Sequence, residues 1–496
     1  MTGSTPGGAT QIETHGIEVI PEAERSGRAR EMFSLWFGGN ILATYLLFGG
    51  ILISLGLPLV TALAIAVAGN LAWVFVGILT SMGPEAGTAT MVISRVQYGY
   101  RGTQLSCFFS WLVQVGYEGV DFALAALAAY SLADYLGWHV GTIAKAVILL
   151  AIIAISFVVG LYGKAAIFAV QKVNTWALGI ASVLFVIFLI PHVHWSYHPA
   201  ASLHGWPLTA SILIGITVVL SGPLGYPSTA EYARYLPART SKRAVALFTA
   251  TGGFIPTVAL TVVGILAATV VSPDDFTTSM RHVLPGWFYA IFLIVIVAGL
   301  MANSVYSIYS SGLTLQTMGI KLSRPKTVWF DAVVGVGISV YGVLIAANFL
   351  TVLQNFLLWS IYWLAPFYGI FMVELLTRRG GYDQRGLHAH GGGRYWYRGG
   401  VRWGAMIALG LGMASSALLS NTPYLKGPLA TGLLHGGDLS AVGGFLIGGA
   451  AYWMLCVLPG RRAAAPAVQL DRAVADASVA VAAAPMQLDG ATEVRG

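Results

Sequence analysis

The sequence has very little charge. Only 9% of its 496 residues are Asp, Glu, Lys or Arg, whereas an average soluble protein has about 25%. A chain this long with so few charges cannot cover its surface with groups that water solvates, so the composition excludes a set of soluble domains. Cysteine is scarce too. Cys107 and Cys456 both lie in apolar stretches, which excludes a disulfide framework and a cysteine-based zinc site.

Long apolar stretches make up most of the chain, and 56% of the residues are hydrophobic. A helix needs roughly 20 apolar residues to cross a bilayer, and twelve stretches reach this length, which predicts an all-α polytopic membrane protein. They lie at 33–56, 59–82, 104–132, 142–162, 166–190, 209–229, 244–271, 285–318, 328–346, 350–377, 401–420 and 439–459. The Gly-rich segment 83–103 is expected to be a loop or a continuation of the second span. The polar stretch up to about residue 31 lacks the features of a signal peptide and is predicted to be a tail.

Positive charge is distributed unevenly over the connections between spans. With both termini in the cytoplasm, 24 of the 27 Lys and Arg residues lie on the inner side, and the other three are Lys145, Arg281 and Lys426. This asymmetry is what the positive-inside rule requires. The formal net charge of +7 therefore indicates the topology of a plasma (inner) membrane protein above an anionic leaflet. We expect the lipid bilayer, and no nucleic acid, as its surroundings.

Two spans contain sequences that interrupt a helix. The first has Gly38-Gly39-Asn40 near its inner third, and the sixth has two prolines and two glycines within residues 221–227. A break at membrane depth is tolerated where the backbone lines a cavity. Interrupted helices at matching positions of two halves are typical of a transporter site built from inverted repeats. The alternative is ordinary close packing, because Gly and Pro are common in membrane helices.

The third span carries two carboxylates at membrane depth. Glu118 and Asp121 are three residues apart and share a helical face, and Tyr117 lies four residues before Asp121. One charged side chain at mid-bilayer costs roughly 2.5–3.5 kcal/mol even on a lenient insertion scale, so two carboxylates this close are not expected both to ionise. We predict proton coupling through Asp121 and Glu118, or substrate binding there. The alternative is a hydrated structural pair nearer the outer surface.

The eighth span carries a polar stripe. Asn303, Tyr306, Ser307 and Ser310 recur every three or four residues and so share one face. An Asn amide has donors and an acceptor that can read the edge of a heterocycle, although such residues can also simply join helices. Three further acidic residues near the inner ends of spans are interpreted as interfacial ion pairs: Glu231, Asp331 and Glu374.

Two features outside the spans receive no function. The outer connection 191–207 contains four histidines at irregular spacing, which favours a solvated loop over a metal site or a pH sensor. They are His192, His194, His198 and His204. The Ala- and Val-rich segment after Pro459 is predicted to be a disordered tail.

Three motifs fall on the spans that carry these features. They are Arg95-x-x-Tyr98-Gly99 … Gly116-Tyr117, Gly225-Tyr226 … Ala230-Glu231-Tyr232-x-Arg234-Tyr235-x-Pro237 and Ala302-Asn303 … Ile308-Tyr309-Ser310. They resemble the Arg-x-x-Phe/Tyr-Gly … Gly-Trp, Gly-Trp … Ala-Asp-Tyr-x-Arg-Tyr-x-Pro and Ala-Asn … Ile-Tyr-Ser segments of the purine–cytosine permeases, the nucleobase:cation symporter family 1. The similarity runs over about residues 30–380.

The resemblance implies a LeuT-type fold, in which ten core helices form two inverted five-helix repeats and two peripheral helices follow. It divides the chain into a cytoplasmic tail, a core, a cytoplasmic loop, the peripheral helices and a disordered cytoplasmic tail. These regions are 1–31, 32–377 (repeats about 32–190 and 209–377), 378–400, 401–459 and 460–496.

The resemblance also implies the position of the substrate. In the family an aromatic residue of the third span stacks on the base and an amide one turn later binds its edge; these positions fall on Tyr117 and Asp121. The aromatic residue of the sixth span falls on Tyr226, and the Asn of the eighth span falls on Asn303. With the residues at the two breaks, the predicted substrate-binding set is Gly39, Asn40, Tyr117, Asp121, Gly225, Tyr226 and Asn303.

The chain departs from the family at informative positions. Tyr117 replaces the usual Trp, and Asp121 replaces the usual Asn or Gln, so an amide becomes a group that only accepts hydrogen bonds when ionised. We expect a ligand with two N–H donors there, or an Asp121 that carries the coupled proton. Sodium-dependent relatives have hydroxyls where this chain has Val297 and Ala298. H⁺ is therefore favoured over Na⁺, with backbone carbonyls at the first break as the alternative for Na⁺.

The sequence thus predicts a secondary symporter that imports a purine, cytosine or a related heterocycle by alternating access, without an organic cofactor. The alternative is a carrier of the same fold for a hydantoin, allantoin, thiamine, an amino acid or an amine. An intramembrane enzyme and an ATP-driven pump are not expected, because the chain has neither a His-Glu-x-x-His motif nor a Gly-x-x-x-x-Gly-Lys-Ser/Thr loop. A channel would leave the paired breaks unexplained.

Overall fold

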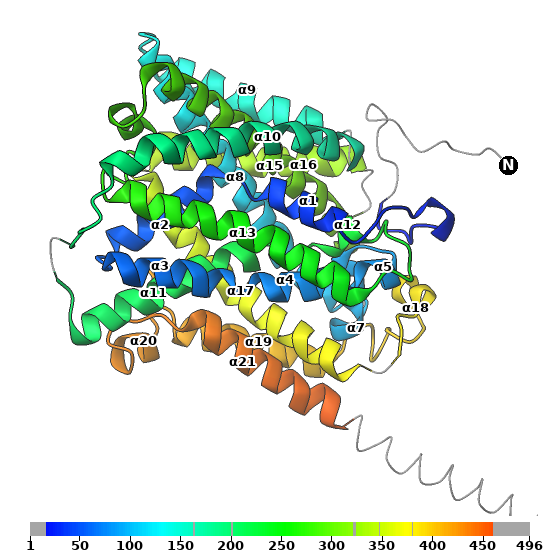
Figure 1. Ribbon diagram of the computed structural model, residues 1–496. Coiled ribbons are helices and arrows are strands. Elements are labelled where there is room, and N and C mark those ends of the chain that lie inside the picture. Colours follow the sequence, from blue (N-terminus) through cyan, green and yellow to red (C-terminus); the bar gives the residue numbers. More distant parts are fainter. Residues whose placement is uncertain are drawn as a thin grey trace, which may run out of the picture.

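The computed structural model describes residues 16–161, 164–199, 202–320, 324–346, 348–378 and 380–459. Over these residues the regular structure is helical, and the long helices run side by side through one bundle (Figure 1). The predicted disordered tail, 460–496, lies outside the described residues.

Each of the twelve predicted spans contains a helix. Nine described helices are long and apolar enough to cross a membrane, a bent pair forms a tenth span, and two shorter apolar helices lie at 329–345 and 403–418. In chain order the helices of the spans are α1 (Glu31–Gly39) with α2 (Ala43–Ser54), α3 (Leu59–Asn70) with α4 (Trp73–Thr80), α8 (Thr103–Tyr135), α9 (Thr142–Leu161), α10 (Lys164–Leu189), α11 (Gly205–Leu224), α13 (Lys242–Ala268), α15 (Gly286–Met318), α16 (Arg324–Val340) with η4 (Tyr341–Ile345), α17 (Phe349–Thr377), α19 (Trp403–Leu418) and α21 (Ser440–Tyr452) with η5 (Trp453–Val457). The last two spans lie along one edge of the bundle, beside α17 (Figure 1).

The first predicted break is confirmed. Helices α1 and α2 meet at an angle of 59°, and Asn40 lies between them. Its side-chain amide donates to the Trp36 carbonyl at 2.8 Å and accepts from the Tyr45 hydroxyl at 2.9 Å, so one side chain satisfies backbone and side-chain groups on both sides of the break. Gly38 also serves close packing, because a Cβ there would lie 2.0 Å from Thr175 Oγ1.

The second predicted break is confirmed as well. Helix α11 ends at Leu224, residues 225–229 are not helical, and the short helix α12 (Ala230–Ala233) follows. Pro223 has no N–H to donate, so the helix is weakened where it stops. The backbone N–H of Gly225 still bonds to the Ser221 carbonyl at 2.8 Å.

The ambiguous segment 83–103 continues the second span as far as Ala86, and its remainder is neither a simple loop nor one continuous helix. The segment forms three short, buried helices, α5 (Gly83–Ala86), α6 (Thr90–Ile93) and α7 (Arg95–Tyr98). Arg95 is only 2% exposed, and its guanidinium donates to the Leu387 carbonyl at 2.7 Å. Long-range hydrogen bonds therefore hold this segment against the connection that follows α17.

Segments predicted to lie on the inner side meet at one end of the bundle. The N-terminal stretch bonds to this end through Ile20 N–H to the Gly87 carbonyl at 2.9 Å and through Arg25 to the Pro84 carbonyl at 2.7 Å. Helices α5, α7 and α18 (Gln384–His388) lie there, whereas α20 (Pro428–Gly432) lies at the opposite end (Figure 1). The distribution of basic residues predicts these segments on one side of the membrane, and in the fold they lie at one end of the bundle.

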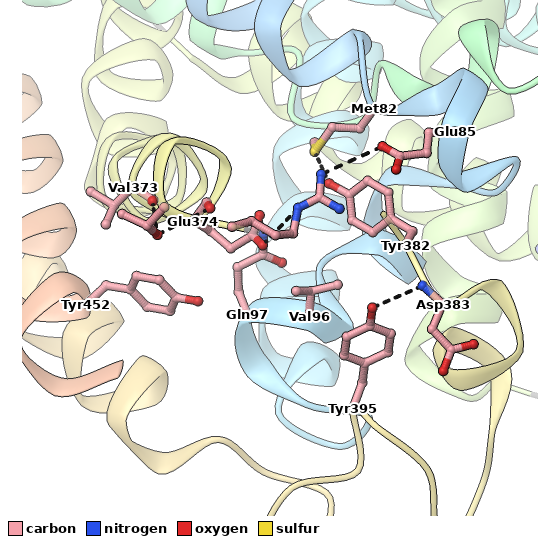
Figure 2. Close-up of polar contacts among 12 residues, drawn as sticks. Met82, Glu85, Val96, Gln97, Val373, Glu374, Tyr382, Asp383, Tyr395 and Tyr452 are labelled. Atoms are coloured by element: carbon pink, nitrogen blue, oxygen red, sulfur yellow. Dashed lines mark hydrogen bonds and ion pairs between the residues drawn. The ribbon is translucent and has the colours of Figure 1, made fainter. Parts of the chain in front are cut away.

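A charged network joins these inner segments. Arg378 lies 3.3 Å from Glu374 and 3.9 Å from Glu85, and its guanidinium stacks 3.5 Å above the Tyr382 ring. Lys242 reaches the same Glu85 oxygen at 2.6 Å. Figure 2 shows Glu85, Glu374 and Tyr382 gathered around one guanidinium. The ion pair predicted for Glu374 is therefore present, with Arg378 as its partner.

The same prediction is wrong for Glu231. It is 1% exposed, and its carboxylate accepts from the Thr90 backbone N–H at 3.2 Å and from the Thr90 hydroxyl at 2.6 Å. Burial with dedicated hydrogen-bond donors satisfies this carboxylate without an exposed ion pair. The four histidines of the outer connection, in contrast, are all exposed, as expected for a solvated loop.

Candidate functional site

A cavity lies between the two interrupted spans and the long helices α8 and α15. Its lining includes all seven residues that the sequence analysis assigns to the substrate: Gly39, Asn40, Tyr117, Asp121, Gly225, Tyr226 and Asn303. The polar stripe of the eighth span faces it too, through Tyr306, Ser307 and Ser310. Residues far apart in the sequence therefore converge where both helices are interrupted, which is where free backbone groups can reach a ligand.

Asp121 is the carboxylate of this cavity. It is 1% exposed, and its two oxygens accept from different helices. The Asn303 amide donates to Oδ2 at 2.6 Å, and the Thr44 hydroxyl lies 3.4 Å from Oδ1. Within the described part of the chain, no Lys, Arg or His forms an ion pair with it. A buried carboxylate without a cation requires a proton, or donors from a ligand, to balance its charge.

Tyr117 joins α8 to the end of α11. Its hydroxyl donates to the Ser221 carbonyl at 3.0 Å, and its ring meets Phe356 edge-to-face with centroids 5.0 Å apart. Gly225 is required beside it, because a Cβ at this position would lie 2.5 Å from the Tyr117 hydroxyl. The Tyr that replaces the usual Trp thus adds a bond to the backbone of the second break.

Tyr226 connects the two breaks. Its hydroxyl donates to Asn40 Oδ1 at 3.2 Å, and its backbone carbonyl accepts from the Tyr368 hydroxyl at 2.7 Å. Its ring packs edge-to-face on Trp36, with centroids 5.3 Å apart, and tilted against Trp73 at 5.4 Å. These contacts form an aromatic wall with a fixed orientation.

Glu118 does not share the cavity with Asp121. It is fully buried in a contact of α8 with α15 and α16, where the Ser311 hydroxyl lies 3.2 Å from Glu118 Oε1 and 2.8 Å from Asp331 Oδ2. The Trp111 indole donates to the other oxygen of Asp331 at 2.5 Å. The predicted interfacial pair is therefore wrong for Asp331, which is fully buried beside a second carboxylate.

Hydrogen counting restricts the protonation of this cluster. The Ser311 hydroxyl has one hydrogen, and it faces Glu118, Asp331 and the Ile308 carbonyl, the last at 3.1 Å. If both carboxylates were ionised, all three neighbours would be acceptors competing for that hydrogen. One carboxyl that holds a proton relieves this conflict, since it donates to Ser311.

Sequence reasoning did not assign several other lining residues to the site, among them Trp36, Thr44, Tyr45 and Gln114. Gln114 had a signal, because it lies three residues before Tyr117 on the same face of an apolar helix. Thr44 and Tyr45 had none, because their contacts depend on the angle between α1 and α2.

Comparisons with known proteins place the chain in a family. The model of a family described as "Permease for cytosine/purines, uracil, thiamine, allantoin" matches residues 19–448. A Bacillus subtilis protein named as a purine-cytosine permease, YxlA, is 28% identical over 460 residues, which cover 90% of this chain and 96% of that protein. The purine-cytosine permease fcyB of Emericella nidulans is 26% identical, with 90% and 88% covered.

Solved structures share the fold. The nucleobase-cation-symport-1 family transporter Mhp1, in a closed conformation with bromovinylhydantoin bound, has a TM-score of 0.71 at 17% identity, covering 89% of this chain and 94% of its own. A Na⁺-coupled sialic acid symporter has a TM-score of 0.56 at 11% identity, covering 88% and 91%. These similarities confirm the LeuT-type fold, with ten core helices in two inverted repeats and two peripheral helices. The chain belongs to the family of permeases for cytosine/purines, uracil, thiamine and allantoin, and it is a multi-pass membrane transporter of small heterocycles rather than an enzyme.

Proposed function

We propose that this permease imports a nucleobase or a closely related heterocycle by H⁺ symport, and that the cavity between the breaks is its substrate site. The observation that carries the proposal is Asp121, a buried carboxylate in the cavity that receives two neutral donors and, among the described residues, forms no ion pair with Lys, Arg or His. A heterocycle with N–H groups supplies further donors to this carboxylate, and the coupled proton that enters with the heterocycle balances the negative charge.

The remaining lining suits a flat, polar ring. Tyr117 and Tyr226 provide aromatic surfaces from α8 and from the second break, and aromatic groups prefer offset or edge-to-face contacts with one another. The Asn303 amide donates one of its two hydrogens to Asp121. The second hydrogen and the amide oxygen of Asn303 can then bind the edge of a substrate. In this assignment Gly39, Asn40 and Gly225 bring the backbone of the breaks close to the ligand.

The choice of H⁺ over Na⁺ rests on the residue types available. Val297 and Ala298 offer no side-chain oxygen, and hard cations are held by oxygen ligands. Asn40 is already occupied, because its oxygen accepts from Tyr45 and Tyr226 and its amide donates to Trp36. Asp121 is proposed to carry the coupled proton, and Glu118 with Asp331 to hold a second one.

We also propose the topology and the division of the chain that the sequence analysis predicts. Both termini are assigned to the cytoplasmic side of the inner membrane, with the core at 32–377, the inner loop at 378–400 and the peripheral helices at 401–459. Alternating access then exposes the cavity first to one side and then to the other. Modification of single cysteines introduced into the 191–207 and 378–400 connections of whole cells tests the orientation.

The test of function uses the purified protein in liposomes. A thermal-shift panel of nucleobases, hydantoins, thiamine and amino acids first selects ligands, and uptake of the best one is then driven by a pH gradient or by a Na⁺ gradient. We expect uptake to follow an inwardly directed H⁺ gradient and to collapse with a protonophore. Uptake that Na⁺ stimulates and a protonophore leaves unchanged would reject H⁺ coupling, and stabilisation by amino acids alone would reject the substrate class.

A further inference from the structure

We infer that Gln114 is a further substrate-binding residue, whose side-chain oxygen accepts an N–H at the opposite edge of the substrate from Asp121. The inference rests on the proposed function and narrows its substrate class. Gln114 lines the cavity and is 5% exposed. Neither the predicted site nor the family motifs include it.

The orientation of the Gln114 amide follows from its neighbours. The nitrogen Nε2 lies 3.0 Å from the Ser110 carbonyl, 3.0 Å from the Ser110 hydroxyl and 3.2 Å from the Thr314 hydroxyl. A backbone carbonyl only accepts hydrogen bonds, so the NH₂ group and not the oxygen must face it. The two amide hydrogens are thereby used within the protein, on α8 and α15.

The oxygen of the same amide has no partner. Gln114 Oε1 is buried and receives no hydrogen bond from the residues that the structure describes, and the same holds for the buried hydroxyl of Tyr306, another lining residue. Buried polar groups in native proteins are almost always satisfied, so an orphaned acceptor and an orphaned hydroxyl in one cavity indicate groups that a ligand completes. The Gln114 oxygen can accept a hydrogen bond from an N–H of the ligand, and the Tyr306 hydroxyl can donate one to a ring nitrogen or a carbonyl.

The spacing on α8 defines the class of ligand. Gln114, Tyr117 and Asp121 follow one another at three and four residues and so lie along one face, with Tyr117 in the middle. Seven residues span about 10.5 Å along a helix axis. A ring beside Tyr117 therefore has a hydrogen-bond acceptor beyond each end. This arrangement selects a planar nitrogen heterocycle with N–H donors on opposite edges, as in an amino-substituted purine or pyrimidine.

A cycle of variants and ligands tests the inference. The ligands are the best substrate from the panel and its singly N-methylated analogues, each of which lacks one N–H. In the unmodified protein, methylation at the edge that Gln114 reads is expected to weaken binding roughly 2- to 10-fold, the range of one hydrogen bond. In Gln114→Met, which has similar size and no acceptor oxygen, that penalty should vanish, while the penalty at the other edge should remain.

Matched variants separate recognition from structure. Gln114→Glu keeps an acceptor at this position and should keep the methylation penalty, and it also serves if Gln114→Met does not fold. Thr314→Val removes a partner of the amide nitrogen and leaves the oxygen in place, so it should keep the pattern of penalties. If Gln114→Met weakens every analogue by the same factor, or none, the inference is wrong. If the unmodified protein binds no nitrogen heterocycle at all, the proposed function fails instead.

Discussion

Two carboxylates one turn apart on α8 have opposite surroundings. Asp121 and Glu118 are equally buried, at 1% and 0% exposed. Asp121 faces the cavity, and its hydrogen-bond donors among the described residues, Asn303 and Thr44, are neutral. Glu118 faces a closed helix contact in which its nearest polar neighbours are Ser311 and, through it, Asp331. Burial alone therefore does not identify a binding residue; the identity of the neighbouring groups and access to a cavity do.

The chemistry of the two positions differs accordingly. Donors on both oxygens of Asp121 stabilise its ionised form, which then attracts further N–H groups. Around Glu118 the single hydroxyl hydrogen cannot satisfy two ionised carboxylates, so a retained proton is favoured there. The first position is suited to a ligand that enters and leaves together with the coupled proton, and the second to a further proton held between helices.

The largest expected effect separates these two carboxylates directly. In Asp121→Asn, loss of a charged acceptor should weaken substrate binding roughly 10- to 100-fold, since hydrogen bonds to charged groups contribute about 1.5–3 kcal/mol. The matched variant Glu118→Gln should leave binding within about threefold, because Glu118 does not line the cavity. Equilibrium binding of the panel ligand to detergent-solubilised protein measures both. Equal losses of ligand affinity in the two variants would contradict the assignment of Asp121, and not Glu118, to the substrate site.

The next effect concerns the closed cluster. Asp331→Ala removes the acceptor of the Trp111 indole and one of the three acceptors around the Ser311 hydroxyl, and a buried N–H left unpaired costs about 1–3 kcal/mol. We expect a clear drop in thermal stability in detergent. Asp331→Asn, which keeps an acceptor oxygen, should lose less.

This prediction also has a transport readout. If Glu118 and Asp331 hold a proton that participates in coupling, Asp331→Asn should flatten the pH dependence of uptake while ligand affinity changes little. A pH profile identical to that of the unmodified protein would assign the cluster to stability alone.

A smaller effect is expected at the junction of α8 and the second break. Tyr117→Phe removes the hydrogen bond to the Ser221 carbonyl, which is worth about 0.5–1.5 kcal/mol, and it keeps the aromatic ring. Uptake should fall by at most about tenfold, with ligand affinity nearly retained. A loss of binding in Tyr117→Phe would instead show that the hydroxyl itself contacts the ligand. The second variant, Tyr117→Trp, introduces the residue usual in the family and tests whether a larger ring can compensate for the missing hydroxyl.

Much of the fold could be predicted from the sequence because lipid imposes strict rules. Twelve apolar stretches correspond to helices, since a backbone in hydrocarbon must satisfy its own hydrogen bonds. Gly38-Gly39-Asn40 and the Gly-Pro cluster of the sixth span mark both breaks, because these residues disfavour a continuous helix. Asp121 was also predictable, since few carboxylates are tolerated at membrane depth.

The errors have a common physical origin. Glu231 and Asp331 lie near basic residues in the sequence, and proximity along the chain suggested interfacial ion pairs. In the fold they are buried against Thr90, and against Trp111 and Ser311, respectively. A pattern along one helix does not specify which other helix covers it.

The sequence by itself determined the class of molecule, the spans, the two interruptions and the scarcity of buried charge, because each follows from local composition and the cost of burying polar groups in lipid. Only the tertiary structure decided which of two adjacent carboxylates faces the cavity, and that the amide nitrogen of Gln114, another lining residue, bonds to the Ser110 carbonyl. These outcomes depend on the rotation of α8 about its axis and on its contacts with α15 and α16. Because α15 and α16 come much later in the chain than α8, no single stretch of sequence encodes these contacts.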